Sequence, residues 1–135
     1  MKPIIIKGGV VRGRGYGSVL GFPTANLERR SYSRLKKKPR LGIYAGLATI
    51  GNQTKEYRAA IVIGPLDKKK LPKIEAHLLD FSGTLYDKQL SLTLLSYLRP
   101  FQDFSSETSL KNQIQADVER VREIDNKTLP PQRAR

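Results

Sequence analysis

The sequence predicts a small, mostly-β protein, built as a closed antiparallel β-barrel with one helix near its C-terminal end. Short apolar segments with period-two alternation recur between residues 4 and 98, and Gly, Pro and Asn separate them. Only the segment after residue 106 spaces its apolar residues at helical intervals. Because an open sheet leaves strand edges unpaired, closure into a barrel is the expected arrangement.

The N-terminal half supplies the first strands of this barrel. Residues 4–11 are rich in Ile and Val and predict a strand with a bend or bulge at Gly8-Gly9. Residues 42–50 and 56–63 predict a β-hairpin, joined by a turn at Gly51-Asn52. Gly64 and Pro65 follow and are expected to end the second strand of that hairpin.

The C-terminal half predicts two further strands and the helix. Residues 74–81 alternate, which places Glu75, His77, Leu79 and Phe81 on one face, and residues 89–98 predict a long strand. Ser105 and Ser106 are candidate N-caps of the helix. Its apolar stripe consists of Leu110, Ile114, Val118 and Val121.

Length and composition limit the classes of protein to be considered. A chain of 135 residues is expected to form one domain, here residues 1–124, followed by a flexible basic tail over 125–135. The absence of cysteine excludes disulfides, thiolate metal sites and cysteine catalysis. No apolar run has the roughly 18 residues that span a bilayer, so we expect a soluble cytoplasmic protein.

The net charge of +13 is large for this length and attracts anions. Either ATP or RNA fits such a field, so charge alone does not choose between a kinase and a nucleic-acid binder. Seven Lys and Arg residues fall between Glu28 and Leu41. We expect this basic segment to be a mobile, solvated loop.

Residues 8–27 combine a run of glycines with the tetrapeptide Pro23-Thr24-Ala25-Asn26. Glycines allow positive φ and a close approach of the backbone to a ligand, as phosphate-binding loops require. Pro23 favours an extended chain, which puts the oxygen ligands of Thr24 and Asn26 on the same side. Such ligands suit Mg²⁺, which keeps water and phosphate oxygens as its other ligands. A plain turn with a flexible glycine hairpin remains the alternative.

Two better-known phosphate motifs are absent from this segment. No Gly-x-x-x-x-Gly-Lys-Ser/Thr sequence occurs, which excludes a P-loop. The glycine run also leads into Phe22-Pro23 and not into a helix, so a dinucleotide-binding fingerprint is not supported.

The glycine segment resembles the signature of the riboflavin kinase family. The resemblance rests on residues 9–17 and on Leu20-Gly21-Phe22-Pro23-Thr24-Ala25-Asn26-Leu27. Further matches follow in order at residues 42–45, 63–64, 75–81, 85–86, 97–101 and 110–117. The resemblance implies a six-stranded Greek-key barrel with the helix alongside. It also implies transfer of the γ-phosphate of ATP to riboflavin, giving FMN and ADP, by a kinase that lacks an adenylyltransferase module.

The same resemblance implies a role for particular residues. Glu75 would act as the base on the ribityl hydroxyl and contact the flavin, and Arg99 would touch the flavin or its new phosphate. Thr24 and Asn26 would hold Mg²⁺, or another divalent cation, against the ATP phosphates. The remaining residues expected to bind ATP are Gly13, Gly15, Gly17, Ser18, Gly21 and Pro23.

Plainer interpretations of these residues stay open at this stage. Glu75 could be a solvated carboxylate on a strand, Arg99 a member of a surface ion pair, and His77 a hydrogen-bonded packing residue. Two other functions also remain: a small basic barrel that binds RNA, and a flavin-binding regulator without turnover. We favour a monomeric enzyme that binds no nucleic acid and no membrane.

Overall fold

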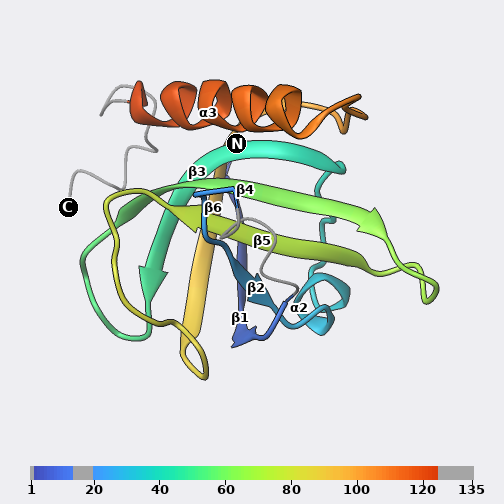
Figure 1. Cartoon of the computed structure of the whole chain (residues 1–135). Coiled ribbons are helices and arrows are strands. Elements are labelled where there is room, and N and C mark those ends of the chain that lie inside the picture. Colours follow the sequence, from blue (N-terminus) through green and yellow to red (C-terminus); the bar gives the residue numbers. More distant parts are fainter. Residues whose placement is uncertain (1, 14–19, 125–135) are drawn as a thin grey trace.

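A computed structural model describes residues 2–13 and 20–124 of the chain. In this part of the chain, six antiparallel strands close into a barrel in the order β1-β2-β5-β4-β3-β6, and one long helix lies across its outside (Figure 1). The strands are β1 (Ile4–Val11), β2 (Ala25–Leu27), β3 (Gly42–Ile50), β4 (Tyr57–Leu66), β5 (Pro72–Leu78) and β6 (Gln89–Arg99). The helices are α2 (Arg30–Ser33) and α3 (Glu107–Arg122). The predicted barrel with a C-terminal helix is confirmed.

The barrel encloses the main hydrophobic core. Alternate residues of every strand point inward, as the period-two pattern predicted; Ile61 and Ile63 of β4 and Leu90 and Leu92 of β6 are completely or almost completely buried. Fully burying an aliphatic side chain of this size contributes roughly 1.5–3 kcal/mol. The inward faces of the six strands therefore hold the barrel together.

A second apolar cluster lies between the outside of the barrel and α3. Strand β3 is buried on both faces, because its inward residues meet the core while Ala45 on its outward face packs under the helix. Val118 and Val121 supply the helix side, which confirms the predicted stripe. Ser106 caps α3, since its hydroxyl accepts a 3.1 Å hydrogen bond from the backbone N–H of Ser109. None of the helices in the described ranges is long and apolar enough to cross a membrane.

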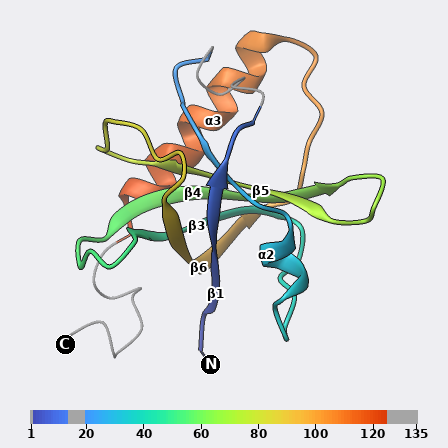
Figure 2. The ribbon, with the colours of Figure 1, turned by 90° about the horizontal axis from the view of Figure 1, so that it is seen from below.

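The basic segment after Glu28 differs from the predicted mobile loop. It contains α2, buries Ser31, and packs Tyr32 and Leu35 against the barrel core. These apolar and small residues interrupt the charges and give the segment contacts with the core. Gly8 on β1 allows the approach, because a Cβ at Gly8 would lie 2.0 Å from the hydroxyl oxygen of Ser31. Strand β1 pairs with β6 without a register shift, so the predicted bulge at Gly8-Gly9 is absent. Helix α2 lies beside β1 (Figure 2).

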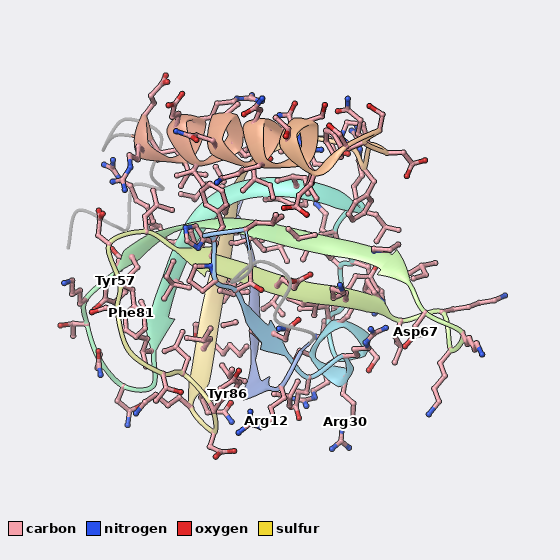
Figure 3. The ribbon with its side chains drawn as sticks, viewed as in Figure 1. Arg12, Arg30, Tyr57, Asp67, Phe81 and Tyr86 are labelled. Atoms are coloured by element: carbon pink, nitrogen blue, oxygen red, sulfur yellow. The ribbon has the colours of Figure 1, made fainter. Side chains whose placement is uncertain are left out.

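Two strand ends also differ from the prediction. Strand β4 continues past Gly64 to Leu66, with a register irregularity between Ile63 and Leu66. Strand β5 ends at Leu78, and the chain reverses at Asp80, which adopts a φ of 60°. Phe81 therefore leaves the face of Glu75 and packs edge-on against Tyr57, with ring centroids 5.4 Å apart (Figure 3). The predicted tail over residues 125–135 lies outside the described residues.

Candidate functional site

A cavity of about 1040 Å³ lies on the outer side of the barrel, between strands β2, β4 and β5 and the N-terminal half of α3. Its walls include Thr24, Asn26, Glu75 and His77 from the strands. The segment 101–106, which connects β6 to α3, forms its other side. A cavity of this size suits small-molecule ligands.

Strand β2 places Thr24 and Asn26 at the edge of this cavity. Ala25 and Leu27 point into the barrel and are buried, so Asn26, with Thr24 just before the strand, faces the other way. The predicted shared side of Thr24 and Asn26 is confirmed. Asn26 is paired in register with Glu75 of β5, which brings the amide and the carboxylate to neighbouring positions.

A direct hydrogen bond joins the two strands at this point. The hydroxyl of Thr24 donates to Oε2 of Glu75 over 2.9 Å. Glu75 is largely buried, with 19% of its side chain exposed, so it is not the freely solvated carboxylate of the plainer interpretation. Thr24, Asn26 and Glu75 thus form one group of oxygen-bearing side chains.

Lys73 completes this group, although the sequence analysis did not single it out. Its Nζ lies 3.2 Å from Oε1 of Glu75, so each carboxylate oxygen has one partner. The signal was present in the sequence, because residues two apart on a strand share a face. The sequence analysis assigned no function to Lys73.

The structure describes some of the glycines that were predicted to bind ATP. Gly13 packs against the amide of Asn26: a Cβ at Gly13 would lie 2.2 Å from Nδ2 of Asn26, so a larger residue would displace that side chain. Gly21 has a φ of 92°, a conformation that favours glycine. The other predicted ATP-binding positions Gly15, Gly17 and Ser18 lie outside the described residues.

His77 holds the chain before β2 in place. Its Nδ1 lies 2.7 Å from the carbonyl oxygen of Pro23. A carbonyl only accepts hydrogen bonds, so Nδ1 carries the hydrogen and donates it. The ring also meets Phe22 edge-on, with centroids 5.7 Å apart. These contacts support the interpretation of His77 as a hydrogen-bonded packing residue.

Arg99, at the end of β6, forms a two-pronged ion pair with Asp117 of α3. Nε lies 3.0 Å from Oδ1 and Nη2 lies 2.8 Å from Oδ2. Only 15% of the Arg99 side chain and 5% of the Asp117 side chain are exposed, so this is not a surface pair. Gln113 donates a further hydrogen bond to Asp117, and the guanidinium lies 5.9 Å from the centre of the Phe104 ring. This network joins the helix to the barrel at the cavity wall.

Two basic segments adjoin one side of the cavity. Segments 28–40 and 67–73 together carry eleven Lys and Arg residues against two carboxylates. Arg29 and Asp67 join the two segments through a 2.6 Å ion pair. The backbone N–H groups of Leu71 and Lys69, together with Arg29, hold the pKa of Asp67 below its usual value. Arg29 and Lys73 are the basic residues of these segments that line the cavity, where they offer positive charge to an anionic ligand.

Comparisons with known proteins find similar sequences and a similar fold. A model of the Flavokinase family, described as riboflavin kinase, matches residues 1–125. The riboflavin kinase of Mus musculus is 35% identical over 124 residues, covering 89% of this chain and 79% of that protein. RibR, an RNA-binding riboflavin kinase of Bacillus subtilis, is 34% identical over 115 residues. That match covers 84% of this chain and 48% of RibR. The crystal structure of riboflavin kinase from Trypanosoma brucei is similar with a TM-score of 0.67 and 26% identity, covering 91% of this chain and 80% of that chain.

Proposed function

This chain belongs to the riboflavin kinase family, and we propose that the cavity beside β2 and β5 is where it carries out the reaction of that family. The reaction transfers the γ-phosphate of ATP to the ribityl 5′-hydroxyl of riboflavin, which gives FMN and ADP. The observation that carries the proposed location is the hydrogen bond between Thr24 and Glu75. It joins the predicted metal ligand to the predicted base inside one cavity.

Glu75 is the proposed general base. Phosphoryl transfer to an alcohol requires the alcohol, the metal and the phosphate to be held in line, and requires removal of the hydroxyl proton. Glu75 is the one carboxylate next to Thr24 and Asn26 among the described cavity residues. Its position on β5, in the middle of a closed sheet, keeps it rigid.

Thr24 and Asn26 are the proposed ligands of Mg²⁺. The donor set fits such an ion: a hydroxyl and an amide oxygen are hard ligands, and the described residues contain no cluster of three or more His, Cys, Asp or Glu that would form an all-protein metal site. An ion held this way relies on water and phosphate oxygens for its remaining ligands. When bound, it would offset negative charge on the phosphates of ATP.

The α3 side of the cavity is the proposed flavin site. Phe104, Leu110 and Ile114 offer it apolar and aromatic surface. Arg99 lies at the boundary of that surface and presents a charge whose direction Asp117 fixes. An aromatic ring system with a polar ribityl chain matches this division of the cavity, with the ribityl end towards Glu75.

The proposed enzyme acts as a monomer in the cytoplasm, where ATP is available. Its molecular mass in solution, measured by light scattering, tests this part of the proposal.

The decisive experiment mixes the purified protein with riboflavin, ATP and MgCl₂ and measures FMN by chromatography. We expect FMN and ADP to form in equal amounts. A folded protein that binds riboflavin and forms no FMN would instead be the non-catalytic flavin binder. Omitting ATP, and separately omitting MgCl₂, controls for contaminating FMN and for the metal requirement.

A further inference from the structure

The cavity is lined by three Lys and Arg side chains from the described residues: Arg29, Lys73 and Arg99. Two of them are committed to acids that lie away from the Thr24–Glu75 group. Arg29 pairs with Asp67 at 2.6 Å, and Arg99 pairs with the buried Asp117 at 2.8 Å. Both arginines therefore have ion-pair partners other than the proposed base.

Lys73 differs from these two arginines, because its partner is the proposed base itself. Its ammonium group lies 3.2 Å from Oε1 of Glu75, while Oε2 accepts the hydrogen bond from Thr24. With 39% of the side chain exposed, Lys73 keeps room to move along the cavity wall. A flexible four-carbon stem lets a lysine ammonium follow a moving anion.

We infer that Lys73 is a further substrate-binding residue, whose ammonium group passes from Glu75 to the terminal phosphate of ATP when the nucleotide binds. This inference rests on the proposed function of the cavity. A terminal phosphate carries more negative charge than one carboxylate, so it is the stronger partner for the ammonium group. The move also releases Oε1 of Glu75, which then accepts the hydroxyl hydrogen of riboflavin.

Lys73 neither gives nor takes a proton in the transfer step. The ribityl oxygen forms a bond to the γ-phosphorus, the bond from that phosphorus to the β-phosphate oxygen breaks, and ADP leaves. Glu75 takes the hydroxyl proton. Lys73 contributes charge and hydrogen bonds to the transferred group, which stabilises the negative charge on its oxygens.

The test measures nucleotide binding by calorimetry with MgCl₂ present and riboflavin omitted, so no turnover occurs. For Lys73→Gln we expect ATP affinity to fall about tenfold, as for loss of one charged hydrogen bond, while ADP affinity changes little. Lys73→Arg should keep most of the preference for ATP. The control is Lys69→Gln, which removes the same charge from an exposed position of the β4–β5 turn. It should leave the ATP affinity near that of the parent.

A second pair of variants separates phosphate binding from a merely structural pairing with Glu75. In a Glu75→Gln background, Lys73 has no carboxylate partner. If Lys73 binds phosphate, adding Lys73→Gln still lowers ATP affinity there. If it only neutralises Glu75, the added change has no effect, and the inference is overturned. Equal losses for ATP and ADP, or equal effects of Lys69→Gln and Lys73→Gln, would also overturn it.

The test of Lys73 and the test of kinase activity can fail independently. A parent protein that forms FMN, combined with a Lys73→Gln variant that binds ATP normally, refutes only the role of Lys73. A parent protein that binds ATP and forms no FMN refutes the kinase assignment, whatever Lys73 does.

Discussion

The hydroxyl of Thr24 donates a 2.9 Å hydrogen bond to Glu75, although 51 positions separate the two residues in the sequence. Pairing of β2 with β5 creates this contact, since Asn26 lies opposite Glu75 in the register. The proposed metal ligands and the proposed base therefore belong to one sheet. Changes at Thr24 and Asn26 should therefore weaken metal-dependent ATP binding, whereas a change at Glu75 should slow the chemical step.

The first prediction concerns the metal ligands. Thr24→Val keeps the shape of the side chain and removes its oxygen, and Asn26→Ala removes the amide. We expect each variant to fold and to lose most Mg²⁺-dependent ATP binding, while riboflavin binding suffers less. Calorimetry with and without MgCl₂ measures this. Thr54→Val, in the exposed β3–β4 loop, is the control, and full Mg²⁺-dependent turnover in either site variant would refute the metal assignment.

The second prediction tests the base. Glu75→Gln retains the shape and the hydrogen bonding of the side chain but cannot take a proton. Riboflavin and ATP should still bind, while kcat falls by roughly 10²–10⁴-fold, with the loss near the low end if proton transfer is late. Steady-state FMN formation measures kcat. An unchanged kcat would remove Glu75 from the mechanism, and failed riboflavin binding would make it a substrate ligand.

The third prediction concerns the buried pair between β6 and α3. Asp117→Ala leaves the guanidinium of Arg99 largely buried without its carboxylate, which typically costs about 3–5 kcal/mol of unfolding free energy. Urea denaturation followed by circular dichroism measures the loss. Asp80→Asn is the control, because the ion pair of Asp80 with Arg122 is exposed and should contribute little, and Asn tolerates the φ of 60° at this position. Similar midpoints for the two variants would contradict a structural role for Asp117.

The fourth prediction concerns pH and the β4–β5 turn. In the folded state the pKa of Asp67 lies below 3.8, the usual value for an aspartate. The causes are the hydrogen bond from the N–H of Leu71, then that from the N–H of Lys69, and the positive charge of Arg29. A depressed pKa stabilises the fold above the unfolded pKa, and this stabilisation is lost as the pH falls through the folded pKa. Asp67→Asn should therefore be less stable than the parent at pH 7, and the difference should shrink below about pH 4. A difference that stays constant across this range would show that the charge of Asp67 is not involved.

The fifth prediction concerns the basic segment. Replacing Lys36, Lys37 and Lys38 by Gln should raise the KM for ATP modestly, and the effect should fade with added salt, because exposed charges are screened over about 10 Å at 0.1 M. FMN formation at several ionic strengths measures this. Tight binding of single-stranded RNA by the parent, lost in the triple variant, would instead support an RNA-binding role for this segment. Weak RNA binding that is equal in both proteins would argue against that role.

Local patterns in the sequence predicted most of the barrel and part of the site. Alternation of apolar residues predicted β3, β4 and β6, because a strand that faces a core on one side must repeat every two residues. The N-cap Ser106 and the apolar stripe through Val118 and Val121 predicted α3, because residues three or four apart share one face of a helix. The shared side of Thr24 and Asn26 followed from extended geometry alone, so each of these features depended only on neighbours in the chain.

Features that depend on distant contacts were decided by the tertiary structure. The basic residues after Glu28 predicted a loop. In the structure, Tyr32 and Leu35 of this segment pack against the barrel core, and these contacts hold the segment in place. Strand β5 ends earlier than alternation suggested, because the chain turns at Asp80, which adopts a φ of 60°. The partner of Arg99 became clear only when β6 and α3 were packed together.

The sequence by itself predicted five of the six strands and the terminal helix. Only the tertiary structure determined that Lys73 and Thr24 occupy the two oxygens of Glu75, and that Arg99 lies against Asp117. The physical reason is that local periodicity reflects which side of a strand faces the core. The identity of the residue opposite depends on the register of the whole barrel, which forms only when all six strands close together.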